Sequence, residues 1–83
     1  MVLLDIKRKI REIIADVLEI GTETIDDEAD LEKDLGCSTG ECLVILNRIR
    51  NACKIDICYA DIKDITKVSQ LFELASKKAG VAA

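Results

Sequence analysis

The most informative segment of the chain is DLGCSTGECLVILNRIRNAC, which spans residues 34–53. Ser38 and Glu41 in this segment have the S-x-x-E spacing of a capping box. In that arrangement the serine hydroxyl accepts a hydrogen bond from an amide one turn into the helix, and the glutamate carboxylate accepts one from the serine amide. The segment therefore predicts a helix that begins at about Thr39, directly after its cap, and ends at about Ala52.

Apolar residues in this predicted helix recur at helical spacing, and they indicate which face is buried. At about 100° per residue, the buried stripe is expected to contain Cys42, Leu43, Leu46, Ile49 and Cys53. The candidate partner-binding surface lies on the opposite face and contains Glu41, Val44, Arg48 and Asn51. Val44 is the apolar residue of that outer face, where it could contact a partner.

Two other segments have amphipathic periodicity and predict further helices. Residues 3–20 carry apolar side chains at three- and four-residue steps, with charged residues between them. We expect Gly21 to follow this helix with a positive φ. Residues 66–79 form the last predicted helix, which is capped by the threonine at its start and stopped by Gly80. A short helical turn is expected at residues 59–64.

Residues 22–37 form an acidic segment without sustained periodicity. Eight of the sixteen acidic residues lie between Glu19 and Asp34, where Lys33 is the only base. A loop of this length is unusual in a compact domain and is often functional. Its carboxylates could bind a divalent cation only weakly, since nothing in the sequence fixes their geometry. We expect an ordered loop that is held to the core by its isolated apolar residues Ile25, Leu31 and Leu35.

Length and composition narrow the possible functions. The 83 residues predict a single domain over residues 1–83 that is too short for a catalytic cleft between two lobes, so we do not expect an enzyme. Hydrophobic residues make up 49%, yet only Tyr59 and Phe72 are aromatic, which is typical of an aliphatic helical bundle. The net charge of −4 disfavours nucleic-acid binding, which needs clustered Lys and Arg. Residues 1–4 are too short an apolar stretch for a signal peptide. We therefore expect a cytoplasmic monomer that does not insert into membranes.

The four cysteines form two C-x4-C pairs, Cys37 with Cys42 and Cys53 with Cys58, and the chain contains no histidine. Without an export signal, they are expected to be reduced thiols rather than a disulfide framework. Redox stapling is the minority interpretation. Four thiolates could also hold a tetrahedral zinc ion, which makes a zinc-binding structural domain a third hypothesis. The buried position expected for Cys53 disfavours that hypothesis.

The order of these elements resembles that of acyl carrier proteins. Asp34-Leu35-Gly36 is similar to the turn that precedes the attachment site of that family, and Ile65-Thr66-Lys67-Val68 is similar to the start of its last helix. The resemblance covers nearly the whole chain. It implies an all-α four-helix bundle with three longer helices, a short third helix and a long loop after the first. It also implies that the domain takes part in fatty acid or polyketide biosynthesis.

Acyl carrier proteins carry 4′-phosphopantetheine as an ester on the serine of an Asp-Ser-Leu triplet. The resemblance, in ungapped register, places Ser38, Thr39 and Gly40 at these three positions. Ser38 can replace aspartate as a helix cap. Thr39 keeps a hydroxyl where the family has its serine, but the β-methyl crowds the oxygen. The candidate cofactor-binding residues are therefore Thr39 and Ser38, and we expect little or no loading of the natural sequence by a broad-specificity phosphopantetheinyl transferase.

The resemblance further implies a function in presenting a tethered acyl group to carrier-dependent enzymes. Carriers of this family usually line the second helix with carboxylates, whereas this sequence retains Glu41 and carries Arg48 and Arg50. Because charge complementarity governs encounter rate and partner choice, the usual enzymes should recognise this surface poorly. Two alternatives follow: a divergent carrier with dedicated partners, or an unmodified module that binds proteins through Val44, Arg48 and Asn51.

Overall fold

The computed structural model describes residues 3–80, so residues 1–2 and 81–83 of the expected domain lie outside the described part. The elements in chain order are α1 (Leu3–Leu18), the 3-10 turn η1 (Thr22–Thr24), α2 (Thr39–Cys53), α3 (Tyr59–Ile62) and α4 (Val68–Ala79). Residues 3–80 contain no β-strand, although Asp30 and Lys67 form an isolated bridge. The structure confirms the predicted all-α fold of three longer helices and one short helix.

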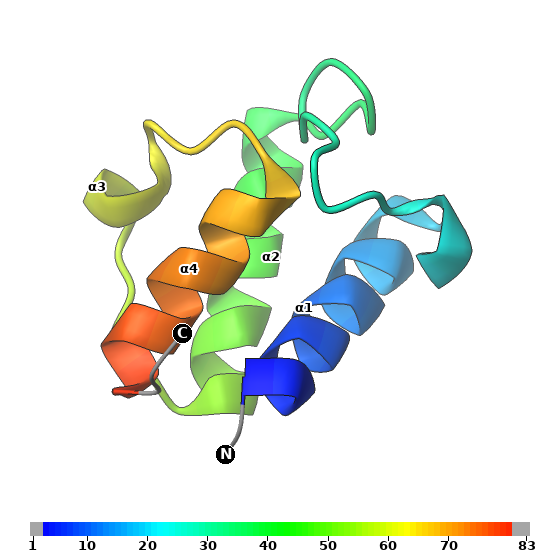
Figure 1. Cartoon of the computed structure of the whole chain (residues 1–83). Coiled ribbons are helices and arrows are strands. Elements are labelled where there is room, and N and C mark those ends of the chain that lie inside the picture. The colour runs from blue at the N-terminus through cyan, green and yellow to red at the C-terminus, as the bar shows by residue number, and fades with distance from the viewer. Residues whose placement is uncertain (1–2, 81–83) are drawn as a thin grey trace.

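The three longer helices pack against one another, and α3 lies to one side (Figure 1). The long loop after α1 crosses the end of the bundle at which α2 and α4 begin (Figure 1). This arrangement places the loop beside Ser38 and the first turn of α2. Within residues 3–80, no helix is both long enough and apolar enough to cross a membrane.

The core is aliphatic, as the composition predicts. Ile6, Ile10 and Ile14 follow one another at four-residue steps along α1, and each has no exposed surface. Burying an isoleucine side chain contributes about 1.5–3 kcal/mol. The only phenylalanine, Phe72 of α4, is buried, and the guanidinium of Arg11 lies 5.3 Å from its ring centre. The charged face of α1 thereby also contacts α4.

The buried face of α2 differs from the prediction at two positions. Its buried residues are Ile45, Leu46, Ile49 and Cys53. Leu43 is 39% exposed and Cys42 is half-buried, so the inward position predicted for Leu43 is wrong and Ile45 takes it. Residues 42–46 are all apolar, and either stripe fits helical spacing. The packing of α1 and α4 against α2 decides which is buried.

Two predicted helix boundaries also need correction. Gly21 has an extended conformation with φ −73°, and the positive φ after α1 belongs to Glu19 instead. The cap of α4 is Lys67 rather than Thr66. The Gln70 side chain accepts hydrogen bonds from the amides of both residues, and Gln70 is the third residue of the helix that begins after Lys67. Gly80 ends α4 with φ 73°, as predicted.

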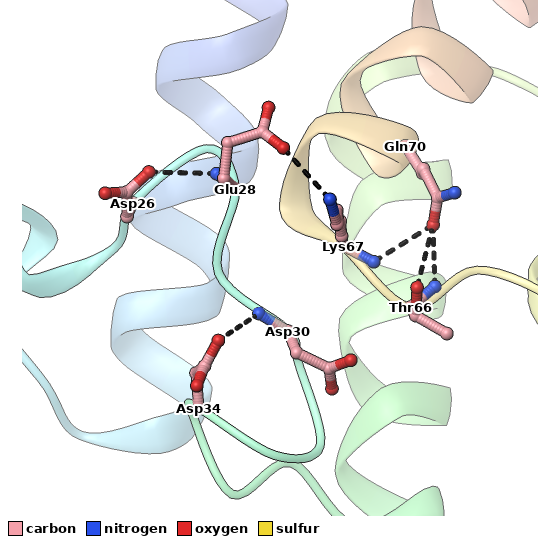
Figure 2. A network of polar contacts seen from close by, with 7 residues as sticks. All are labelled: Asp26, Glu28, Asp30, Asp34, Thr66, Lys67 and Gln70. Carbon is pink, nitrogen blue, oxygen red and sulfur yellow. Dashed lines mark hydrogen bonds and ion pairs between the residues drawn. The ribbon is translucent and has the colours of Figure 1, made fainter.

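The acidic loop is ordered by its own carboxylates. Asp30 Oδ1 accepts from the amides of Glu32 and Lys33 at 3.0 and 2.8 Å, and Asp34 Oδ2 accepts from the Asp30 amide at 2.7 Å (Figure 2). Such side-chain acceptors replace the main-chain partners that a loop lacks. The predicted apolar anchors also contact the core, with Ile25 and Leu31 buried and Leu35 partly buried. The loop is therefore a fixed part of the domain.

Candidate functional site

Ser38 caps α2 as the sequence predicts. Its Oγ accepts a hydrogen bond from the Glu41 amide at 3.2 Å, and Glu41 Oε1 accepts one from the Ser38 amide at 3.0 Å. The residue has extended backbone angles and is exposed. The Ser38 oxygen is thus directed at the start of the helix, although water reaches it.

Thr39 and Gly40 are the first two residues of α2, and both are exposed. The Thr39 hydroxyl makes none of the hydrogen bonds of the capping box, which joins Ser38 and Glu41. A Cβ atom added at Gly40 would approach no atom closer than Ser38 Oγ at 4.0 Å. The position could therefore hold the apolar side chain that the family triplet has there.

A groove of about 520 Å³ opens beside these hydroxyls. Ser38 and Thr39 lie at its edge, together with Lys33, Lys63 and the half-exposed Tyr59. Its apolar walls come from three helices and the segment after α3, and they include Cys42, Ile45, Leu46, Ile62, Ile65 and Leu71. A polar rim over an apolar interior is typical of small-molecule sites. This groove was not predicted, because it depends on where α3 lies.

The start of α2 is tied to the start of α4 through the acidic loop. The Cys37 amide donates to the Leu31 carbonyl at 2.8 Å, and the Leu31 amide donates to the Thr66 carbonyl at 2.8 Å. Lys67 Nζ, at the start of α4, also lies 3.2 Å from Glu28 Oε2 of the loop (Figure 2). These bonds fix the chain that leads into Ser38.

A second set of contacts holds α3 beside the groove. Asp61 Oδ2 accepts from the Cys58 amide at 3.0 Å and lies 3.7 Å from Lys78 Nζ of α4. The hydrogen bonds from the Cys58 amide and thiol, assisted by Lys78, lower the pKa of the Asp61 carboxyl. The charged form of Asp61 therefore secures a helix of only four residues.

The predicted partner surface lies on α2, but its residues do not all point freely to solvent. Val44 is 44% exposed, and Asn51 is exposed. Glu41 is engaged in the capping box, and Arg48 forms an ion pair with Asp16 of α1. The Arg48 charge is therefore partly balanced within the domain, which the sequence did not indicate.

The cysteines occupy different environments, and none forms a disulfide. Cys37 Sγ lies 3.0 Å from Cys42 Sγ, Cys53 is buried, and Cys58 is exposed. Burial, followed by the neighbouring Cys42 thiol, raises the pKa of Cys37 to about 12. Residues 3–80 bring no three Cys, Asp or Glu side chains together as metal ligands, which argues against the zinc hypothesis.

Two comparisons with known proteins concern most of this chain. The sequence profile of the family described as "Phosphopantetheine attachment site" matches residues 8–75. The chain is 30% identical over 74 residues to a Streptomyces avermitilis protein named polyketide-8 synthase acyl carrier protein 2, and the alignment covers 89% of this chain and 85% of that protein. The matched region runs from α1 to α4 and includes Ser38 and Thr39. The chain therefore belongs to the phosphopantetheine-attachment family and is a carrier domain of the acyl-carrier type.

Proposed function

We propose that this domain presents an acyl group on a 4′-phosphopantetheine arm and that Thr39 is the attachment residue. The contrast between neighbouring hydroxyls supports the proposal: both residues are exposed beside the groove, but Ser38 Oγ is bound in the capping box and the Thr39 hydroxyl is not. The ungapped register with the family triplet also points to Thr39. When bound, the arm supplies a terminal thiol that holds acyl groups as thioesters.

The residues around Thr39 fit a phosphodiester. The first turn of a helix carries free amides and the positive end of the helix dipole, both of which favour a phosphate. In α2 the capping box uses the amides of Ser38 and Glu41, so the amides of Thr39 and Gly40 between them take no part in it. Thr39 would supply the ester oxygen, and the helix start would stabilise the negative charge beside it.

The groove provides a place for the cargo. Its volume of about 520 Å³ lies within the range of about 300–1,000 Å³ typical of small-molecule pockets. Ile45, Leu46 and Ile62 give it an apolar wall, which suits the hydrocarbon part of an acyl chain. In this proposal the domain has no catalysis of its own and acts as a cytoplasmic monomer that serves carrier-dependent enzymes.

Loading should be slow in the natural protein. The β-methyl of Thr39 crowds the attacking oxygen, and Gly40 lacks the apolar side chain of the family triplet. The variant Ser38→Asp/Thr39→Ser/Gly40→Leu restores all three positions, and the open space around Gly40 admits the leucine.

The test is incubation with coenzyme A, magnesium and a broad-specificity phosphopantetheinyl transferase, followed by intact-mass spectrometry. We expect rapid addition of one group to the triple variant and only slow addition to the natural protein at high transferase concentration. Thr39→Val removes the hydroxyl at nearly constant shape and should abolish loading. Ser38→Asp, which keeps an acceptor for the helix cap, should not abolish it. Loading that survives Thr39→Val but is lost in Ser38→Asp would transfer the role to Ser38.

The second candidate is an unmodified protein-binding module. It is favoured by the exposed apolar side chains Leu43 and Val44 on α2. In that case the natural protein would accept no group under forcing conditions, although the triple variant would. That pair of results would reject the carrier proposal while leaving the fold and the register intact.

A further inference from the structure

Two cysteine pairs with the same sequence spacing have different geometry in the folded domain. The Sγ atoms of Cys37 and Cys42 lie 3.0 Å apart. Cys53 is buried at the end of α2, whereas the exposed Cys58 directs its thiol at Asp61 Oδ2, 3.4 Å away. The contact between Cys37 and Cys42 is therefore a property of the fold rather than of the C-x4-C spacing.

The main chain holds this thiol pair in place. Cys37 directly precedes the cap Ser38, and Cys42 is the fourth residue of α2. These are the two positions that meet in a hydrophobic staple, which fixes the direction of the chain at a helix start. The capping box holds the segment between them, and the Cys37 amide is bonded to the Leu31 carbonyl at 2.8 Å. The two sulfurs are thus brought together before any reaction.

A metal ion is a poor occupant of this pair. Tetrahedral zinc with bonds of about 2.3 Å to sulfur needs four ligands and sulfurs roughly 3.8 Å apart. The described residues supply no third cysteine, aspartate or glutamate in a metal-binding group. A bond between the two sulfurs needs no other ligand, and it requires them to approach from 3.0 Å to about 2.05 Å.

We propose that Cys37 and Cys42 form a dithiol modification site that low-molecular-weight disulfides, such as glutathione disulfide, oxidise reversibly to an intramolecular disulfide. The half-buried Cys42 reacts first: its thiolate attacks one sulfur of the oxidant, and one glutathione thiolate leaves. Cys37 sulfur then attacks Cys42 sulfur in the mixed disulfide and displaces the second glutathione. The two thiol protons end on two glutathione molecules, and two electrons pass from the cysteine pair to the oxidant.

Burial explains why Cys42 rather than Cys37 reacts first with the oxidant. The raised pKa of Cys37 leaves little thiolate to meet external reagents at neutral pH, since the thiolate is the attacking species. The attack of Cys37 on Cys42 also needs the Cys37 thiolate, whose proton passes to solvent, but this step is intramolecular and needs no encounter. The resulting covalent loop encloses Ser38 and Thr39, so it would restrain the start of α2 and the edge of the groove.

The test uses the unloaded natural protein and does not depend on the proposed carrier function. Reduced protein is equilibrated in glutathione redox buffers, quenched with acid, treated with N-ethylmaleimide and digested with trypsin. Residues 34–48 form one peptide that contains both Cys37 and Cys42, whereas residues 51–54 and 55–63 carry Cys53 and Cys58 separately. We expect peptide 34–48 to lose two hydrogens and to take up no maleimide, while the other two peptides are alkylated.

Denatured protein provides the control for simple proximity in sequence. The oxidation equilibrium constant of peptide 34–48 should be at least about tenfold larger in the folded domain than in concentrated urea, which corresponds to about 30 mV for a two-electron couple. The variant Cys53→Ser/Cys58→Ser should give the same ratio as the natural protein. A folded-to-denatured ratio near one, two maleimides on peptide 34–48 in oxidising buffer, or a bridge between Cys53 and Cys58 would overturn the proposal.

Discussion

Replacing Ser38 by alanine should destabilise the domain by a predictable amount. The change removes the oxygen that accepts from the Glu41 amide at 3.2 Å and leaves that amide to water at an exposed helix start. Loss of a serine cap typically costs about 1 kcal/mol. In a domain of this size that cost lowers the melting temperature by about 4–8 °C. The reciprocal bond to Glu41 Oε1 uses a main-chain amide and can persist.

The measurement is urea denaturation followed by far-UV circular dichroism, with a thermal melt of the same samples. Ser38→Asp is the matched control, because a carboxylate keeps the acceptor and is favoured by the helix dipole. We expect it to lie within about 0.5 kcal/mol of the natural protein, since the nearby Glu41 carboxylate opposes part of the dipole gain. The denaturant slope should not change, because neither variant alters the surface that unfolding exposes.

An alanine variant as stable as the natural protein would show that the Ser38 oxygen does not stabilise the start of α2. The structural ground for preferring Thr39 as the attachment residue would then disappear, and only the register with the family triplet would remain. An aspartate variant as unstable as the alanine variant would point to the hydroxyl proton rather than to the capping oxygen. Either result would require Ser38 to be reconsidered as the nucleophile.

The remaining predictions test charge, titration and backbone conformation. Arg50→Glu should increase the association rate with an ordinary carrier-dependent enzyme several-fold at low salt, and the gain should fade as salt screens it; an unchanged rate at low salt counts against the electrostatic argument. Burial raises the pKa of Cys37 from 9.0 to about 12, so the unfolded chain loses this proton at a lower pH than the folded domain does. The free energy of unfolding should therefore decline between about pH 9 and pH 12. The decline should be shallower in Cys37→Ala, and an equal decline in that variant would contradict the prediction. Gly36 has φ +70°, so Gly36→Ala should destabilise the domain by about 1 kcal/mol. Gly40 has open space around it, so Gly40→Ala should stabilise the domain by about 0.4–1 kcal/mol. Denaturation midpoints that move in the same direction in both variants would contradict this.

Much of the fold could be predicted from the sequence, because the helices have strong periodicity and well-marked ends. The capping box of Ser38 and Glu41 fixes the start of α2 by local bonds alone, and local bonds are what a sequence motif encodes. The choice between Leu43 and Ile45 as a buried residue was wrong for the opposite reason. Both fit the helical spacing, and only the neighbouring helices distinguish them.

The end of α1 shows a similar limit. Gly21 is the residue best suited to a positive φ, yet Glu19 adopts it, and the Ile20 amide donates to the Ala15 carbonyl. Partly buried Ile20 packs against the core. The chain therefore turns where that packing requires it, and a residue that tolerates a positive φ need not be the one that adopts it.

The hydroxyl pair of the candidate site could be located from the sequence, but its surroundings could not. The register of the family triplet placed Ser38 and Thr39, whereas the groove and the ion pair of Arg48 with Asp16 join segments far apart in the chain. The contact between Cys37 and Cys42 could have been predicted from the sequence. Their positions on either side of the capping box are those of a hydrophobic staple, a signal that the C-x4-C spacing alone conceals.

Attachment of the prosthetic arm to Thr39 can be measured on the protein isolated from the cells that make it. Intact-mass spectrometry would be followed by fragmentation of tryptic peptide 34–48. We expect a single phosphopantetheine group, with backbone fragments that place it on Thr39. A protein that is unmodified throughout, or an arm located on Ser38, would rule out attachment at Thr39.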